Sequence, residues 1–405
     1  MASAKGAKPD PEHVTKRALL AWESGAGRGH VSALRGFAQA LAPAFVCDAA
    51  LCKMKFASVL EPHCEMVFRS RSHAADITRR PNGGTEPIGT WGDYLGDVGF
   101  GEPQWLIEQV GWWILTMEAR QSDLVVADFA PGAMLAARIL DIPVVMIGTG
   151  YFAPPAGLDQ YPVLLPQYGK RHYDEVVLLA SVNAAMAYFG AEPLARLSDV
   201  YRSDVAMIQS ITELDPYVGH RNAPYMPPIA SETPFASGGG EEIFVYFSTD
   251  EHRDDALCDA IAGLGSRARL HMPAIPADLA ERMNAAGVQV LTHPAPLEEI
   301  AARSRIMVNA GQHGSLCTGI GMGLPQVAIP RHLEHLFHAR RAEALGAVRV
   351  VPRQERSSER IRAAILDLWH SADAGMRTRD LAHRLAPTLR GSVRQALSER
   401  LAGLM

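Results

Sequence analysis

Two separate runs of alternating strand and helix patterns constrain the fold of this 405-residue chain more than any other feature. In both halves, short apolar segments of strand length are followed by segments with apolar residues at helical spacing. The expected strands of the first half are residues 17–23, 45–49, 123–128 and 142–148. Those of the second half are residues 242–249, 268–274, 288–293, 305–310 and 326–330. This alternation is typical of parallel sheets with helices on both faces, so we expect an α/β fold with two such sheets.

A segment rich in proline and glycine separates the two runs. Residues 214–241 contain several prolines and end in a triple glycine, a composition typical of a linker. The chain is also too long for one ordinary core. We therefore expect an N-terminal Rossmann-like domain over residues 14–216, a linker over 217–241 and a C-terminal Rossmann-like domain over 242–380. A last helix over 381–405 is expected to pack back toward the N-terminal domain.

Composition narrows the class of protein. A net charge of −5 provides no basic surface for a nucleic-acid partner. The first residues lack an apolar signal core, and no run approaches the roughly 18 apolar residues of a membrane span. The five cysteines form no C-x-x-C pair, which favours buried, reduced thiols. We therefore expect a cytoplasmic globular protein without a nucleic-acid partner or stable membrane insertion.

A glycine-rich loop follows the first expected strand. It reads WESGAGRGHVSAL and contains Gly25, Gly27, Gly29 and His30. A dinucleotide-binding turn is one interpretation, because Asp48 follows at the distance of a ribose-binding acid. That motif, however, needs a small residue where His30 stands. We therefore favour a loop whose glycines allow His30 to face a cleft.

His30 and Asp128 are the candidate catalytic residues. His30 is expected at a helix N-terminus, where the dipole disfavours the imidazolium and keeps the ring neutral at pH 7. A neutral imidazole is a competent general base for a hydroxyl group. Asp128 ends the strand 123–128 and could orient His30 or bind the substrate. A structural histidine and a helix N-cap are the alternatives for these two residues.

The stretch AGQHGSLCTGIGMGLP, residues 310–325, is the strongest motif of the second half. Its pattern predicts a strand, a turn with Gly311 and Gly314, and a helix with Ser315 as its N-cap. Free N–H groups and the helix dipole make such a helix start suitable for a phosphate. An ordinary strand-to-helix turn is the alternative interpretation of the local pattern.

With the residues that follow it, this motif resembles the donor-binding signature of the UDP-glycosyltransferase superfamily, nucleotide-sugar glycosyltransferases with the GT-B fold. The positions in register are Gly311, Gly314, Ser315, Gly323, Pro325, Pro330, Glu334 and Ala339. GRGHVSAL resembles the first-strand loop of these enzymes and the G-x-G-G-H loop of the peptidoglycan N-acetylglucosaminyltransferase. ADFAPGAMLAARILDIPVV resembles their Asp-containing βαβ unit. The resemblance implies two Rossmann-like domains with parallel sheets that face an interdomain cleft.

The resemblance places the donor site on the C-terminal domain. The turn after the strand 305–310 would bind the phosphates, together with the end of the strand 242–249. Glu334 can accept two hydrogen bonds from vicinal sugar hydroxyls, and His335 can add one. The expected donor-binding residues are Ser248, Thr249, Gly311, Gln312, His313, Gly314, Ser315, Glu334 and His335.

Several positions depart from the family signature, among them His335, which stands where the family has a glutamine. Ala310 stands where the family has a phosphate-contacting histidine, and Thr318 stands where it has a glutamate that contacts the ribose. Gln312 replaces a glycine. His313 occupies the variable position, and either its ring or Ser315 with backbone N–H groups could take over the phosphate contact. The departures leave the nucleotide and the affinity for the donor open.

A metal site is an alternative interpretation of HLEHLFH. His332, His335 and His338 lie within about a third of a helical circumference. Neither a cysteine nor an H-E-x-x-H arrangement lies nearby. We therefore expect no metal and no cofactor, with the nucleotide sugar as a co-substrate.

The irregular region 53–113 is dense in glycines and aromatic residues. Aromatic walls suit a flat or apolar ligand. Trp91, Tyr94 and Phe100 stand among glycines and are the expected acceptor-binding residues. Trp112 and Trp113 adjoin a helix-like run and are expected in the core.

Together these features imply an inverting glycosyltransferase that moves a sugar from a UDP- or TDP-sugar to an acceptor hydroxyl or amine. The acceptor is expected to be a small or lipid-linked molecule, and a homodimer is an open alternative. A nucleotide-sugar epimerase of the same fold is the second enzymatic interpretation. A non-catalytic nucleotide-sugar-binding protein is the interpretation that Ala310 and Thr318 favour.

Overall fold

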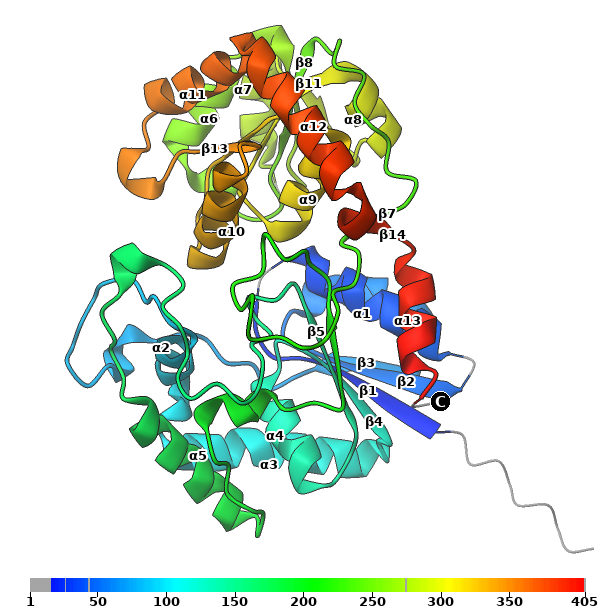
Figure 1. The fold of residues 1–405 in the computed structure, drawn as a ribbon, viewed down its shortest axis with the longest axis vertical. Coiled ribbons are helices and arrows are strands. Elements are labelled where there is room, and N and C mark those ends of the chain that lie inside the picture. Colours follow the sequence, from blue (N-terminus) through cyan, green and yellow to red (C-terminus); the bar gives the residue numbers. More distant parts are fainter. Residues whose placement is uncertain (1–15, 26, 43, 274, 404–405) are drawn as a thin grey trace, which may run out of the picture.

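The computed structural model describes residues 16–25, 27–42, 44–273 and 275–403, which form the two α/β domains of Figure 1. Each domain contains a six-stranded sheet. All neighbouring strands in the two sheets run parallel. The two parallel sheets predicted from the sequence are therefore confirmed.

The N-terminal sheet has the strand order β3-β2-β1-β4-β5-β6. Its strands are β1 (Lys16–Trp22), β2 (Phe45–Leu51), β3 (Met66–Arg69), β4 (Leu124–Asp128), β5 (Val144–Gly148) and β6 (Val205–Ile208). Its helices are α1 (Arg28–Leu41), α2 (Trp91–Leu95), α3 (Pro103–Arg120), α4 (Pro131–Ile139) and α5 (Glu175–Tyr188). Leu19 and Ala21 of β1 enter one apolar cluster, and Leu20 and Trp22 enter another. Strand β1 is apolar and buried from Ala18 to Trp22 because both of its faces are covered there.

The C-terminal sheet repeats this topology in the order β10-β9-β8-β11-β12-β13. Its strands are β8 (Glu242–Tyr246), β9 (Ala268–His271), β10 (Gln289–Leu291), β11 (Ser304–Asn309), β12 (Gln326–Ala328) and β13 (Val348–Val350). Its helices are α6 (Asp255–Ala262), α7 (Ala277–Ala285), α8 (Leu297–Arg303), α9 (His313–Met322), α10 (Leu333–Ala344), α11 (Ser358–His370) and α12 (Ala372–Leu389). The strand order reverses between β1 and β4 and again between β8 and β11. Ligands of such sheets bind outside the carboxyl ends of the strands at this point.

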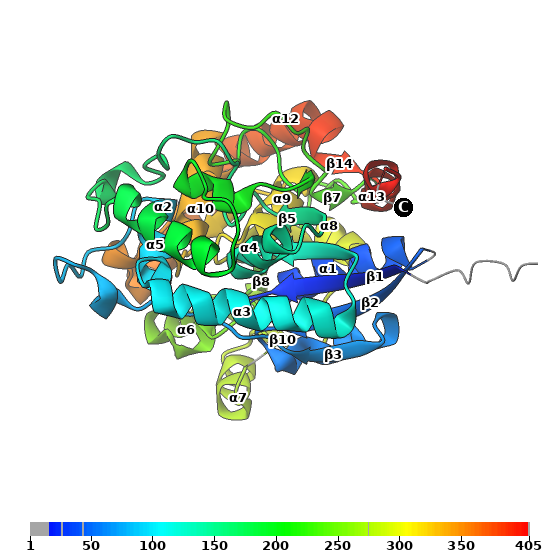
Figure 2. The ribbon, with the colours of Figure 1, turned by 90° about the horizontal axis from the view of Figure 1, so that it is seen from below.

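The structure places helices in part of the region expected to be irregular. It contains α2, a π-helical turn over Gly96–Phe100 and the long helix α3, which lies next to α5 in the view of Figure 2. On α3, Trp113 is buried while Leu115 is 68% exposed. An apolar helix without a distinct polar face lacks the amphipathic pattern from which helices are predicted.

The end of the chain crosses from the C-terminal to the N-terminal domain (Figure 1). Helix α12 packs against α9, and β14 (Arg390–Gly391) pairs with β7 (Ile229–Ala230). The last helix, α13 (Val393–Leu401), then lies beside α1, where Leu397 and Leu401 join the N-terminal apolar core. The boundary expected at residue 381 falls inside α12. Across the described residues, none of the helices combines the length and apolar character required to traverse a bilayer.

Candidate active site

A cleft with a volume of about 1810 Å³ lies between the two domains and is lined by residues of both. Its walls include the loops that follow β1, β4, β5, β8 and β11, together with the start of α10. These loops follow the carboxyl ends of the strands, where ligands of such sheets bind. The predicted site residues that line it are His30, Trp91, Tyr94, Asp128, Ser248, Thr249, Gln312, His313, Gly314, Ser315, Glu334 and His335.

His30 and Asp128 form a hydrogen-bonded pair in this cleft. His30 lies in the first turn of α1, and Asp128 is the last residue of β4. Their side chains meet with 2.9 Å between His30 Nδ1 and Asp128 Oδ2, and the imidazole stacks on Trp22 at 5.0 Å. Asp128 does not cap α4, whose N-cap is Ala130. With Nδ1–H donated to the carboxylate, the Nε2 lone pair of His30 is available to a substrate.

The helix dipole, expected to keep His30 neutral, is opposed in the structure by the carboxylate of Asp128. Burial lowers the pKa of the imidazole, but the charge and hydrogen bond of Asp128, with a smaller contribution from Glu334, raise the pKa above its ordinary value. A carboxylate at 2.9 Å stabilises the imidazolium more strongly than the partial charge of a helix start destabilises it.

Gly25 is the glycine that makes room for this imidazole. Its φ is +113°, and a Cβ built on it would lie 2.6 Å from His30 Nε2. Gly29 has no described atom within 4 Å of a Cβ built on it. Of these glycines, it is therefore Gly25 that has to be glycine, because a side chain there would collide with the Nε2 edge of His30.

Glu334 faces this pair from the C-terminal domain. It lies in the first turn of α10 and lines the cleft. Burial raises the pKa of Glu334 to about 7, with the charge of His30 lowering it and that of Asp128 raising it. The neighbouring His335 also lines the cleft, and burial lowers its pKa to about 3. A carboxyl group and a neutral imidazole therefore lie opposite the His30 side of the cleft.

The turn between β11 and α9 directs free backbone N–H groups toward the cleft. Helix α9 begins at His313 with Gln312 as its N-cap, so the expectation of a Ser315 N-cap is wrong by three residues. No side chain caps this helix start. Gly314 lies in its first turn, with no described atom within 4 Å of a Cβ built on it. The first-turn N–H groups and the helix dipole suit an anionic ligand.

Gly311 shapes this turn from behind the cleft lining. Its φ is +82°, and a Cβ built on it would lie 2.9 Å from the carbonyl oxygen of His335. Its N–H donates to Asn309 Oδ1 at 2.7 Å. Only glycine fits this position without moving α10, so Gly311 shapes the turn while Gly314 faces the cavity.

The imidazole of His313 makes a contact between the domains. Its Nε2 lies 2.9 Å from the hydroxyl of Ser210, which follows β6 of the N-terminal domain. Cys317 Sγ lies 3.7 Å from both ring nitrogens, and burial lowers the pKa of His313 to about 4. A neutral ring held in this way is poorly placed to add positive charge beside a phosphate.

The loop after β8 has its own buried carboxylate. Glu251 accepts hydrogen bonds from the N–H and the hydroxyl of Thr249, both at 2.8 Å. The hydroxyl of Ser248 instead accepts a hydrogen bond from Gln312 Nε2 at 3.2 Å. Thr318 lines the cleft, and its hydroxyl donates to the carbonyl of Gly314. Of the predicted phosphate contacts, Thr249 is therefore the one already engaged by a neighbouring acid.

An aromatic wall forms the N-terminal side of the cleft. Trp91 stacks on Tyr94 at 4.7 Å, and Phe129 stacks on Phe152 at 4.3 Å. Phe129, Tyr151 and Phe152 line the cleft but were absent from the sequence-based candidates, although Phe129 directly follows an expected strand and the other two lie within four residues of the end of another. Phe100 is only 1% exposed, packs on Trp105 and does not line the cleft, so an acceptor cannot reach it in this structure.

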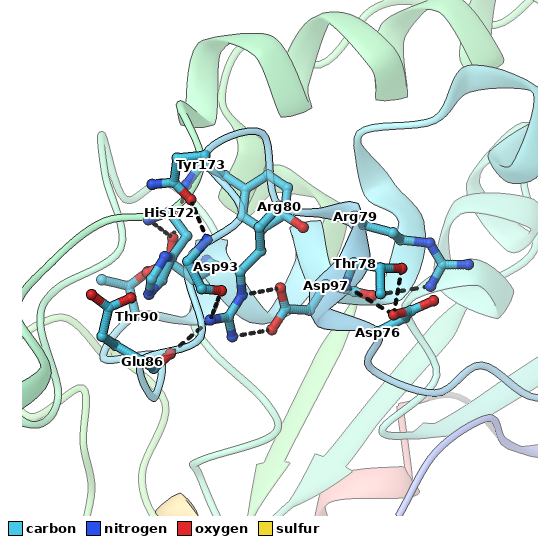
Figure 3. A network of polar contacts seen from close by, with 12 residues as sticks. Asp76, Thr78, Arg79, Arg80, Glu86, Thr90, Asp93, Asp97, His172 and Tyr173 are labelled. Carbon is cyan, nitrogen blue, oxygen red and sulfur yellow. Dashed lines mark hydrogen bonds and ion pairs between the residues drawn. The ribbon is translucent and has the colours of Figure 1, made fainter.

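A buried polar network holds this wall in place (Figure 3). Arg80 makes two parallel hydrogen bonds to Asp97, of 2.8 Å and 2.7 Å. Asp93 accepts hydrogen bonds from Thr90 and from the backbone N–H groups of His172 and Tyr173. The network connects the segment before α2, α2 itself and the segment before α5, and α2 carries Trp91 and Tyr94.

The structure also argues against a dinucleotide site at the glycine-rich loop after β1. Asp48 lies within β2 rather than at its end, and its carboxylate is buried. It accepts hydrogen bonds from Arg17 at 2.9 Å and from Arg120 at 2.9 Å and 3.1 Å. The acid that would bind a ribose in a dinucleotide site is therefore committed to an ion-pair cluster.

The histidines of α10 do not converge. His332 packs edge-on to His335 with ring centroids 5.1 Å apart, whereas His338 packs against His313 at 4.9 Å. Among the described residues, no three histidine, cysteine or acidic side chains are grouped closely enough to hold a metal ion.

Comparison with known proteins gives no match by sequence and clear matches by structure. No protein-family model matches the chain, and no curated protein matches it. The calicheamicin glycosyltransferase CalG4 superposes with a TM-score of 0.66 at 15% identity, covering 96% of this chain and 98% of its own. The spinosyn rhamnosyltransferase SpnG gives 0.66 at 14% identity, covering 96% and 100%. The glycosyltransferase VinC, solved in complex with dTDP, gives 0.63 at 16% identity, covering 96% and 98%.

These similarities define the fold. The chain and the three glycosyltransferases align over nearly their whole lengths, which requires the same arrangement of two Rossmann-like domains around a cleft. The protein therefore has the GT-B fold, as the resemblance in the sequence implied.

Proposed function

We propose that this protein is an inverting glycosyltransferase that moves a sugar from a UDP- or TDP-sugar to a hydroxyl or amine of a small-molecule acceptor. The observation that carries the proposal is the composition of the cleft. A histidine–aspartate pair on the N-terminal domain and an uncapped helix start on the C-terminal domain line the same cavity. A base for the acceptor and an anion site for the leaving group are the two parts that such a transfer needs.

The proposed reaction is one displacement. His30 Nε2 takes the proton of the acceptor while the acceptor oxygen or nitrogen attacks the anomeric carbon. The bond from that carbon to the diphosphate oxygen breaks, and its electron pair leaves with the diphosphate, which the N–H groups at the start of α9 stabilise. Attack opposite the leaving group inverts the anomeric configuration. Asp128 orients His30 and stabilises the imidazolium, and Glu334 with His335 binds the sugar hydroxyls.

A thymidine nucleotide is the first donor to test. VinC is solved with dTDP, and SpnG is solved with thymidine diphosphate and with spinosyn aglycone. In this chain Thr318 replaces the acid that contacts the ribose in the family signature. A deoxyribose has one hydroxyl fewer than ribose to bind at this position, which favours the deoxynucleotide.

Transfer is tested by incubating the protein with radiolabelled dTDP- and UDP-sugars and a library of aromatic and polycyclic alcohols. A labelled product that His30→Ala no longer forms supports the proposal. Release of nucleotide without any acceptor would indicate the epimerase interpretation instead. Binding of dTDP or UDP in calorimetry without turnover would indicate the non-catalytic binding protein.

Gly25→Ala is expected to lower kcat/KM about 10²-fold, because the added methyl displaces the imidazole from the position in which it meets the acceptor. The matched control is Gly157→Ala. Gly157 has a φ of +82° but no described atom within 4 Å of a Cβ built on it, and it lies outside the cleft lining. Steady-state kinetics compare the two. Equal losses would show that backbone strain, rather than contact with His30, causes the effect.

Gly311→Ala and Gly314→Ala are expected to separate folding from donor binding. Gly311→Ala destabilises the protein by about 1–2 kcal/mol from the backbone conformation alone, with the His335 contact adding to this. Gly314→Ala is expected to leave the unfolding temperature unchanged but to raise KM for the donor, because its methyl projects toward the cleft. Urea unfolding and donor titrations measure both. A Gly314→Ala protein with unchanged donor KM would remove this turn from the proposed phosphate site.

A further inference from the structure

A second polar group lies at the deep end of the aromatic wall. Glu23 follows β1 directly, is fully buried and lines the cleft. Its carboxylate accepts hydrogen bonds from the N–H groups of Gly132 and Ala133, at 3.0 Å and 2.9 Å, at the start of α4. Gly132 must be glycine, since a Cβ built on it would lie 2.6 Å from Glu23 Oε1. The carboxylate is therefore held in one position by the backbone.

His73 lies beside this carboxylate and also lines the cleft. Its Nδ1 is 3.6 Å from Glu23 Oε2, longer than a hydrogen bond. The side chain is 1% exposed, and neither ring nitrogen has a hydrogen-bond partner among the described residues. Burial lowers the pKa of His73 to about 3, so the ring is neutral at physiological pH. Leaving such a group without a partner is unfavourable, and a bound polar group would offset this cost.

Aromatic rings surround this pair. Tyr94, Trp105 and Phe129 each lie 6.2–6.4 Å from His73, centroid to centroid. The hydroxyl of Tyr94 is 3.1 Å from that of Ser24, which also lines the cleft. Phe129 contacts both His73 and, at 6.5 Å, His30. The polar pair is therefore separated from the His30–Asp128 pair by one aromatic ring within the same cavity.

The geometry points to Glu23 and His73 as a specificity site for the acceptor, which binds a hydrogen-bond donor remote from the reacting hydroxyl. This inference rests on the proposed function and adds the class of acceptor: a flat, mainly apolar ring system with a second hydroxyl or amino group at its far end. The atoms available at this site are the carboxyl oxygens of Glu23 and the two nitrogens of the neutral His73 ring that lack a described partner, of which one accepts and the other donates. A hydroxyl or amino group of a ligand can donate to the acceptors among them, whereas an ether oxygen cannot.

Calorimetry with two matched probes tests the site without any sugar transfer. 2,6-Dihydroxynaphthalene carries a hydroxyl at each end, whereas 2,6-dimethoxynaphthalene keeps the ring system and lacks both donors. We expect the wild type to bind the diol more tightly, and His73→Phe to reduce that preference about tenfold, the effect of one buried hydrogen bond. His73→Phe removes an imidazole that makes no hydrogen bond to the described residues, so the unfolding temperature should be retained. His73→Leu is the second variant.

His172→Phe is the matched control. Both ring nitrogens of His172 lack a described partner and the side chain is buried, but it does not line the cleft. The control should keep the wild-type preference for the diol. The inference is overturned if both His73 variants keep the wild-type preference, or if the wild type does not bind the diol. Glu23 and His73 would then be a hydrated part of the aromatic wall without a role in specificity. A reduced preference without any sugar transfer would instead contradict only the proposed glycosyltransferase activity.

Discussion

His30→Ala is expected to lower kcat by about 10²–10⁴-fold with any acceptor that must lose a proton, the range that a positioned general base contributes. The imidazole of His30 lines the cleft. It contacts Asp128 through Nδ1, which leaves Nε2 outside that hydrogen bond. KM for the donor should change little, because His30 lies on the N-terminal wall. The measurement is steady-state kinetics with both substrates varied. A kcat within a few-fold of the wild type would rule out His30 as the base.

The pH dependence separates a base from a merely structural histidine. Only the neutral imidazole accepts a proton, so the rate should rise as pH increases through the pKa of His30 and level off above it. Burial lowers this pKa, but Asp128 and Glu334 raise it to above its ordinary value, so the rate should rise at a higher pH than it would with an unperturbed imidazole. Asp128→Asn removes the larger of the two charges that raise the pKa of His30. It should move the rise in rate to lower pH and should also lower kcat. Glu334→Gln should move it in the same direction by less.

If the rise in rate with pH stays at the same pH in Asp128→Asn, the group whose titration controls the rate is not His30. Glu334 is the alternative, because its pKa of about 7 lies in the same range. In that case Glu334→Gln alone would remove the rise in rate. The two variants therefore distinguish which member of the cluster controls the rate.

The residues that the sequence predicted well are those whose position follows from a strand end. His30 comes directly after a strand and a glycine loop, and Asp128 closes a strand, so their meeting follows from the parallel order of β1 and β4. The position of the turn between β11 and α9 follows in the same way from the end of β11. Parallel topology brings such ends to one edge of the sheet, and no knowledge of side-chain packing is needed.

What the sequence could not predict depends on contacts between distant segments. Ser210 and His313 are 103 residues apart and meet only because the two domains face each other. Glu251 reaches back to Thr249 through a turn that the pattern does not specify. The charge of His30 depends on a carboxylate 98 residues away as well as on its own helix. Residue type and local spacing do not predict which distant residues come into contact.

Asp97→Asn is expected to destabilise the N-terminal domain by about 3–5 kcal/mol, because it leaves the buried guanidinium of Arg80 without a counter-charge. The two side chains are 3% and 2% exposed, and Arg80 also donates to the carbonyls of Gly84 and Glu86. The matched control is Glu102→Gln. It removes the carboxylate that pairs with the adjacent Arg79, but Glu102 is 51% exposed, so the loss should stay below about 1 kcal/mol. Urea unfolding followed by tryptophan fluorescence measures both variants.

The same network makes a prediction about function. Asp97 lies just after α2, which carries Trp91 and Tyr94. Loss of its ion pair with Arg80 should let α2 move, and should therefore raise KM for the acceptor more than KM for the donor. Replacing the whole pair, in Arg80→Met with Asp97→Leu, removes both charges and should recover part of the lost stability. If Asp97→Asn and Glu102→Gln lose equal stability, burial does not determine the strength of the Arg80 pair. If the acceptor KM stays unchanged while stability falls, α2 is held in place by its apolar contacts, and the aromatic wall does not depend on the ion pair.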